Sequence, residues 1–196
     1  MSLSILPNVI TVLRVLLIIP FAYYVVEGKH ANALTIFLIA GLSDGLDGLL
    51  AKKFKWQSRF GSITDPLADK MLLFTALLLL VIKGHISWNL FWIATIRDAV
   101  IIGGATAYHY SVGPYEMKPS LISKWNTALM ILLVLLVLCN LVWTFVPLWI
   151  IKWLEITVIV TCIISGIHYI WLGITHYKMN KNQKIEAATK ADNINS

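Results

Sequence analysis

Long apolar runs separated by short polar segments dominate the chain. Six runs approach or exceed the ~20 residues that a helix needs to cross the ~30 Å hydrocarbon core of a bilayer. They cover residues 8–27, 32–51, 66–84, 88–110, 122–145 and 147–177. Because the apolar residues are continuous and do not alternate with polar ones, they indicate helices and not the strands of a barrel. The pattern therefore predicts an all-α polytopic membrane protein with six transmembrane helices.

The overall composition agrees with this pattern. Of the 196 residues, 58% are hydrophobic and 13% are charged, and the mean hydropathy is +0.76. A soluble domain of this size has too much surface for its volume to bury so many apolar side chains. The N-terminus lacks the basic segment and the small-residue cleavage site of a signal peptide, so we expect the first run to be a retained helix.

The distribution of lysine and arginine predicts the orientation in the membrane. Basic residues gather in the second-to-third connection, the fourth-to-fifth connection and the C-terminal tail. Such residues favour the cytoplasmic side, so both termini are expected in the cytoplasm. Residues 1–177 would form the membrane domain and residues 178–196 a polar, disordered tail. Orientation and attraction to anionic lipids account for the net charge of +6, so no nucleic-acid partner is implied.

Four of the ten acidic residues lie close together in the sequence. Asp44 and Asp47 are three residues apart at the end of the second run, and Asp65 and Asp69 are four apart at the start of the third. At about 100° per residue, each pair occupies one helical face. The short connection between the runs brings these faces together. The sequence therefore predicts four carboxylates that converge at the cytoplasmic side of the membrane.

Such a carboxylate group favours a metal site. Four like charges in a low-dielectric site must take up protons or hold cations. Oxygen ligands without histidine or cysteine favour Mg²⁺ or Mn²⁺ over zinc, and two such ions can bridge a diphosphate. Small residues leave room beside the carboxylates for a nucleotide: Gly45, Gly48, Ala51 and Gly61. The alternative is helix capping in a solvated interface, which suits Asp65 before Pro66 but explains four aspartates poorly.

The spacing of these residues resembles a known signature. The stretch Asp44-x2-Asp47-Gly48-x2-Ala51-Lys52-x8-Gly61-x3-Asp65-x3-Asp69 is similar to the pattern D-x2-D-G-x2-A-R-x8-G-x3-D-x3-D of the CDP-alcohol phosphotransferases. The chain departs from the pattern at Lys52, where the family usually has arginine. This exchange keeps the positive charge but loses the bidentate fork that suits a diphosphate.

The resemblance implies an enzyme, usually dimeric, whose site opens to the cytoplasm and inner leaflet, here of a bacterial inner membrane. It implies that Asp44, Asp47 and Asp65 hold the metal ions and the CDP diphosphate. Asp69 would also contact metal and act as general base toward the acceptor hydroxyl, and CMP would leave. The resemblance places further CDP contacts at Gly48, Ala51, Lys52, Gly61, Asn8 and Thr11.

Motifs outside the signature bear on the acceptor. The opening PNVITVLR is similar to bacterial phosphatidylglycerophosphate synthases and cardiolipin synthases of this superfamily. The Arg97–Asp98 pair and the stretch MKPSLISKWNTA at residues 117–128 look like the CMP-forming cardiolipin synthases. These likenesses predict transfer of a phosphatidyl group from CDP-diacylglycerol to phosphatidylglycerol. Two alternatives stay open: glycerol 3-phosphate as the acceptor, and a non-enzymatic cation transporter, although transporters usually place coupling charges near the midplane.

Four basic residues are candidates for binding the acceptor. An arginine within a span is costly and normally faces protein or a polar cavity, so Arg14 is expected to face the site, with snorkelling to the interface as the alternative. Arg97 either contacts the headgroup or forms an internal pair with Asp98. Lys118 and Lys124 either bind the acceptor phosphate or serve only the positive-inside topology.

Overall fold

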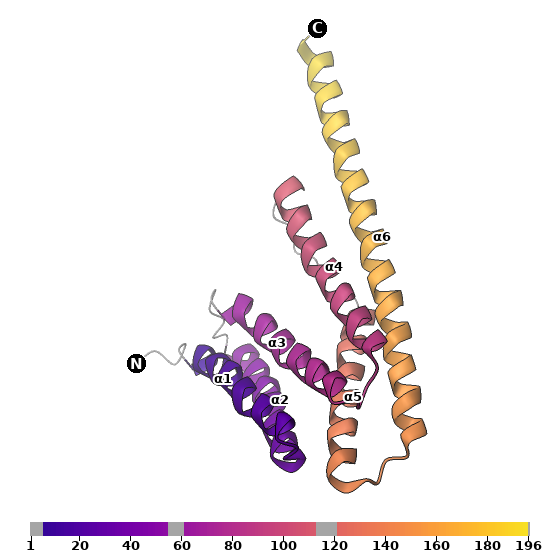
Figure 1. The fold of residues 1–196 in the computed structure, drawn as a ribbon. Helices are drawn as coiled ribbons and strands as arrows, with labels where there is room; N and C mark the ends of the chain where they lie inside the picture. The colour runs from indigo at the N-terminus through magenta and orange to yellow at the C-terminus, as the bar shows by residue number, and fades with distance from the viewer. Residues whose placement is uncertain (1–5, 55–60, 113–120, 196) are drawn as a thin grey trace. The chain divides into compact units, whose positions relative to one another are not determined.

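The computed structural model describes residues 6–54, 61–112 and 121–195, with the side chains of residues 12–43, 70–104, 106, 121–173 and 175. Six helices and no strand occur in these ranges (Figure 1). They are α1 (Leu6–Val26), α2 (His30–Phe54), α3 (Gly61–Ile82), α4 (Trp88–Val112), α5 (Leu121–Trp143) and α6 (Leu148–Asn195). The predicted all-α class is confirmed, and the helices begin and end within a few residues of the apolar runs, except at the end of α6.

The last helix differs from its prediction. The sequence predicts a disordered tail from residue 178, whereas α6 continues as helix to Asn195. The physical reason lies in the composition of this segment, which has no glycine or proline and in which seven of the 18 residues 178–195 are lysine or alanine. These residues have favourable helix propensities. Polarity therefore ends the apolar run without ending the helix.

Two helices in the described part of the chain are long and apolar enough to cross a bilayer. They are α5 and the Leu148–Gly173 portion of α6. Shorter apolar helical stretches occur at Val12–Val26, His30–Ser43 and Lys70–Ile82. Length and composition thus support a membrane location for α5 and α6, and the arrangement of six spans stays a prediction.

Exposed tryptophans lie near both ends of these two helices. Trp125 and Trp143 are exposed on α5, and Trp153 and Trp171 are exposed on α6. Eighteen residues separate the members of each pair, which corresponds to about 27 Å of helix. Tryptophan prefers the membrane–water interface, and the hydrocarbon core is about 30 Å thick. The spacing of the tryptophans therefore independently favours a spanning role for α5 and α6.

The chain divides into two structural units, and α1 packs against other helices within the first of them. This unit comprises Met1–Phe91 and Ala128–Ile156, and the second comprises Trp92–Thr127 and Thr157–Ser196. Within the first unit, α1 packs against both α2 and α3 (Figure 1). Ala33 and Ala40 of α2 and Ala76 of α3 are buried, and small residues let membrane helices approach closely. Phe21 and Phe37 meet in the same core, with ring centroids 5.9 Å apart.

The same motif ends α1 and α3. Gly28 and Gly84 have φ angles of 72° and 75°, a left-handed conformation that glycine adopts without a Cβ clash. After α1, the amides of Gly28 and Lys29 donate to carbonyls three and five residues earlier, at 3.2 and 2.9 Å. After α3, the amides of Gly84 and His85 do the same at 3.0 and 2.9 Å. This Schellman motif satisfies the last carbonyls and turns the chain toward the next helix.

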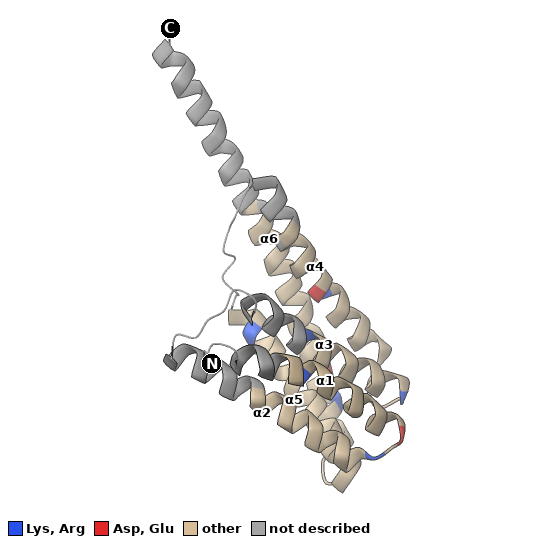
Figure 2. Ribbon diagram, turned by 90° about the vertical axis from the view of Figure 1, so that its left-hand side faces the viewer, with Lys and Arg blue, Asp and Glu red and all other residues tan. Residues whose placement is uncertain are grey.

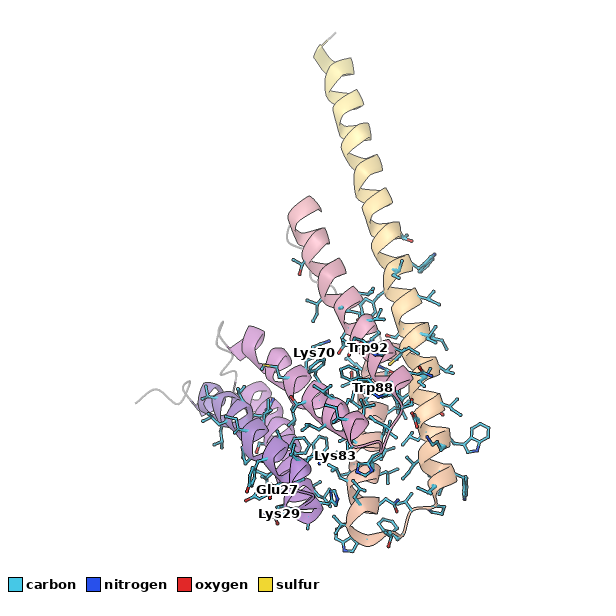
Figure 3. The ribbon with its side chains drawn as sticks, viewed as in Figure 1. Glu27, Lys29, Lys70, Lys83, Trp88 and Trp92 are labelled. Carbon is cyan, nitrogen blue, oxygen red and sulfur yellow. The ribbon has the colours of Figure 1, made fainter. Side chains whose placement is uncertain are left out.

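Within the first unit, residues of the connection from α3 to α4 form hydrogen bonds with several helices. Lys83 Nζ donates to the carbonyl of Val26 at the end of α1, at 2.7 Å (Figure 3), where the helix dipole favours a cation. Ser87 caps α4, since its Oγ accepts the amide of Leu90 at 3.3 Å. The amide of Ser87 donates to Glu155 Oε1 of α6 at 2.8 Å. Residues 83–87 therefore link α1, α4 and α6.

His85 makes this connection sensitive to acid. Its ring lies across from that of His30 at the start of α2, with centroids 6.1 Å apart and an interplanar angle of 83°. Burial, followed by the nearby His30 and Lys83, holds the pKa of His85 below its usual 6.5. A histidine whose pKa is lowered by folding binds protons more readily in the unfolded state. Stability is therefore present above about pH 6.5 and is lost as pH falls through the lowered pKa.

We expect His85→Gln to flatten the acid-side fall in stability, because the variant no longer takes up this proton on unfolding. The measurement is the thermal unfolding midpoint in detergent, from about pH 7 down to about pH 5. His168→Gln removes a histidine that lies beside Trp171 in the other unit and is the control. An acid-side decline in His85→Gln that equals the wild-type decline contradicts the assignment.

Candidate active site

The backbones of α2 and α3 carry the four aspartates of the signature. Asp44 and Asp47 lie in the last part of α2, and Asp65 and Asp69 lie in the first part of α3. Because both stretches are helical, spacings of three and four residues place each pair on one face. The side chains of these aspartates lie outside the described residues, so metal ligation by them stays a prediction.

The donor set fits a hard divalent cation. Four carboxylates offer only oxygen atoms, which suit Mg²⁺ or Mn²⁺. Among the side chains that the structure describes, which do not include these aspartates, no group of three or more histidine, cysteine, aspartate or glutamate residues is placed to hold a metal ion. Other predicted contacts have side chains outside the described residues: Asn8, Thr11, Gly48, Ala51, Lys52, Gly61 and Lys118.

Arg14 lies inside the protein, on the helix that packs against both aspartate-bearing helices. Its side chain in α1 is only 1% exposed, and α1 contacts α2 and α3. Charged residues are sparse along the described helices, where most of the ribbon is tan (Figure 2). A buried arginine in such surroundings faces protein and not the interface. The burial of Arg14 argues against snorkelling to the interface, and both its direction toward the site and its role toward substrate stay predictions.

Arg97 joins three helices of the second unit. The residue is 6% exposed, and its Nη1 donates to Asp98 Oδ1 at 2.7 Å. Its Nε and Nη2 donate to Ser165 Oγ of α6 at 3.3 and 3.0 Å, and Nη2 also donates to Ser123 Oγ of α5. The planar guanidinium makes these bonds possible at the same time. Of the two alternatives for Arg97, the internal pair with Asp98 is therefore present.

The I-S-K-W-N-T stretch at the start of α5 divides into two faces. Ser123 and Asn126 are three residues apart and face protein. Asn126 is fully buried, and its Oδ1 accepts bonds from Thr161 Oγ1 at 2.8 Å and Cys162 Sγ at 3.3 Å, both on α6. Lys124 is exposed, since one residue along a helix turns about 100° away from Ser123. The motif thus combines positions that fix the helix with a lysine open to a ligand.

The residues that α6 contributes were not predicted from the sequence. Thr161 and Ser165 belong to no recognised motif, and single hydroxyl residues within an apolar run do not reveal a partner on another helix. Glu155 did carry a signal, because an acidic residue inside an apolar run is costly and requires a specific environment. The structure supplies that environment at the start of α4.

Comparison with known proteins settles the family. Residues 4–176 match the sequence pattern of the CDP-alcohol phosphatidyltransferases. The chain belongs to this family. It is therefore an enzyme, a CDP-alcohol phosphatidyltransferase, which confirms both the resemblance drawn from the aspartate signature and the predicted enzyme class.

Named relatives of this phosphatidyltransferase fall into two acceptor groups. The chain is 32% identical over 187 residues to a CDP-diacylglycerol–glycerol-3-phosphate 3-phosphatidyltransferase of Haemophilus influenzae, covering 92% of the chain and 96% of the relative. A second enzyme of that name, from Pseudomonas fluorescens, is 41% identical over 101 residues, covering 50% and 49%. The human cardiolipin synthase (CMP-forming) is 32% identical over 145 residues, covering 66% and 48%. The chain thus spans nearly all of the Haemophilus enzyme and about half of the other two, and identity alone does not separate the acceptors.

Proposed function

We propose that this phosphatidyltransferase is a CMP-forming cardiolipin synthase, which transfers the phosphatidyl group of CDP-diacylglycerol to phosphatidylglycerol. One observation carries this acceptor assignment. The two segments in which the chain resembles cardiolipin synthases are joined by the hydrogen bond from Arg97 to Ser123. Segments that are bonded to each other can act as one acceptor site. The exposed Lys124 beside them supplies a cation for the phosphodiester of phosphatidylglycerol.

The proposed chemistry rests on the aspartates of α2 and α3. Asp44, Asp47, Asp65 and Asp69 would hold Mg²⁺ or Mn²⁺, which neutralises the diphosphate and acidifies the acceptor hydroxyl when bound. Asp69 accepts the proton of that hydroxyl. The freed oxygen attacks the phosphatidyl phosphorus, and the bond from this phosphorus to the oxygen of CMP breaks. Arg14, a buried residue of the helix that packs against these two, adds positive charge for the anionic acceptor.

The proposed setting is a bacterial inner membrane. In this proposal all six helices span the bilayer, and both termini and the active site face the cytoplasm. Both substrates are lipids, so the site must open toward the bilayer as well as toward water. The working form is a homodimer, as the family resemblance implies.

We expect purified protein to release CMP from CDP-diacylglycerol in the presence of Mg²⁺ or Mn²⁺ when phosphatidylglycerol is added, with cardiolipin as the lipid product. A chelator should abolish the release, and excess metal should restore it, because the carboxylates need cations to bind the diphosphate. The measurement is CMP formation with lipid product analysis, with each acceptor supplied separately. Stimulation by glycerol 3-phosphate alone overturns the acceptor assignment and leaves the family chemistry intact.

A second candidate is phosphatidylglycerophosphate synthesis, in which glycerol 3-phosphate replaces phosphatidylglycerol. The nearly full-length match to the Haemophilus enzyme favours it. The same lysine would then bind the phosphomonoester of glycerol 3-phosphate. Because both acceptors carry a phosphate and a primary hydroxyl, the catalytic aspartates would act identically in the two reactions.

A further inference from the structure

We propose that Arg97 is a positioning residue that fixes the rotation of α5 about its own axis and thereby the direction of Lys124. Lys124 is the residue proposed above to bind the acceptor phosphate. The inference rests on the proposed function in one respect, namely that the acceptor carries a phosphate. It holds for phosphatidylglycerol and for glycerol 3-phosphate alike.

The first turns of α5 are held at two points on one face. Ser123 Oγ accepts a bond from Arg97 of α4, and Asn126 Oδ1 accepts bonds from Thr161 and Cys162 of α6. Residues three apart lie on the same face of a helix, one turn from each other. A single bond would let the helix swivel about it, whereas two bonds on one face to two different helices prevent rotation. The position of Lys124, about 100° around the helix from Ser123, is then fixed as well.

Besides its bond to α5, the guanidinium of Arg97 is held by side chains of α4 and α6. All three of its nitrogen atoms donate to side chains of the protein, with Asp98 on one side and Ser165 on the other. The Cγ of Arg97 lies 3.9 Å from the position that a Cβ on Gly166 would take, so the arginine stem runs closely over α6. A lysine at this position would replace three guanidinium nitrogens, spread over a planar fork, with a single compact ammonium group. The partners on α4, α5 and α6 are bonded by different nitrogens of that fork, so arginine suits this connection better than lysine.

These contacts separate a positioning role from direct acceptor binding. The guanidinium is buried and its nitrogens are engaged by Asp98, Ser123 and Ser165. A headgroup would have to displace buried charge-assisted hydrogen bonds to reach it, which is costly. Lys124 is exposed on the neighbouring turn. Arg97 therefore acts on the acceptor through α5, and Lys124 makes the contact.

The test compares two serines that bond to the same guanidinium. Ser123→Ala cuts the link to α5 and is expected to raise the KM for the acceptor about tenfold, with kcat and the KM for CDP-diacylglycerol changed less than about twofold. Ser165→Ala cuts the link to α6 but leaves the bond to α5, so it should raise the acceptor KM less than Ser123→Ala does. Thr106→Ala is the matched control, because this hydroxyl on α4 donates to the carbonyl of Ile102 in its own helix, at 2.8 Å. Unfolding midpoints of all variants show whether each is folded.

A double-mutant cycle decides whether Ser123 acts through the lysine. Lys124→Ala should raise the acceptor KM, and adding Ser123→Ala to it should cause little further change, because the misdirected group is already absent. Two results overturn the proposal: equal rises in KM for donor and acceptor, or a Ser123→Ala effect that persists undiminished without Lys124. The assay uses whichever acceptor wild-type protein accepts. The acceptor assignment and the positioning role can therefore fail independently.

Discussion

Asp69→Asn is expected to lower kcat by about a thousandfold or more, since general-base catalysis alone contributes about 10²–10⁴-fold. Asparagine is nearly the same size as aspartate and can still offer one oxygen to a metal ion, but it cannot accept the proton of the acceptor hydroxyl. Part of the metal site should survive, so the variant should still bind CDP-diacylglycerol. CMP release and equilibrium binding of CDP-diacylglycerol are the two measurements. A large fall in CMP release, with binding of CDP-diacylglycerol retained, indicates that the general base has been lost.

The matched control for this variant is Glu27→Gln. Glu27 follows α1 and is exposed beside Lys29, with Oε2 at 3.8 Å from Nζ, so its neutralisation removes one negative charge without touching the aspartate group. This control should turn over like wild type. If Asp69→Asn keeps near-normal turnover, the general base is another group and Asp69 serves at most as a ligand. If it loses binding and turnover together, its main role is to hold the metal.

The helices were predictable because each rests on a local signal. The apolar runs located all six helices, and the glycines that end α1 and α3 occupy positions where only a left-handed residue can close the last turn. The end of α6 was not predictable from hydropathy, because the tail is polar and yet has no glycine or proline and includes lysine and alanine, which favour helix. Hydropathy reports the surroundings of a helix, and helix propensity reports whether the backbone continues.

The candidate site was predictable only where its residues lie close in sequence. Asp44 and Asp47, and likewise Asp65 and Asp69, each share a turn, so their spacing alone places them on one face. The cluster around Arg97 instead joins side chains from α4, α5 and α6. Tertiary partners of this kind leave no periodic pattern. The sequence identified Arg97 and Asp98 as a possible pair but gave no sign that Ser165 completes it.

The buried charges of Arg97 and Glu155 are compensated in different ways. Arg97 is balanced by a neighbouring carboxylate and two hydroxyl groups. Glu155 is balanced by the start of α4, where a free amide and the helix dipole both favour negative charge. In apolar surroundings such compensation is important for stability, because water does not solvate a buried ion that has lost its protein partner. The start of α4 therefore balances the charge of Glu155, whereas side chains balance that of Arg97.

Glu155→Ala is expected to lower the free energy of unfolding by about 3 kcal/mol, the scale of removing one partner of a buried charged hydrogen bond. Glu155 is 3% exposed, and its Oε1 accepts the amide of Ser87 at 2.8 Å. Alanine leaves that amide without its partner at the start of α4 and opens space between α4 and α6. Glu155→Gln keeps an oxygen that can accept the bond, so its loss should be about 1 kcal/mol. Thermal unfolding in detergent measures both.

Lys152→Ala is the control that isolates the buried bond. Lys152 Nζ lies 3.4 Å from the other carboxylate oxygen of Glu155, but its side chain is 67% exposed. Water screens the exposed lysine end of this pair, which limits its contribution to about 1 kcal/mol, and Glu155 keeps its bond from Ser87, so this variant should unfold close to wild type. If Lys152→Ala and Glu155→Ala destabilise the protein equally, the ion pair and not the cap on α4 stabilises this junction. A large loss in Glu155→Ala alone, with partial recovery in Glu155→Gln, assigns the stabilisation to the hydrogen bond that joins α6 to the start of α4.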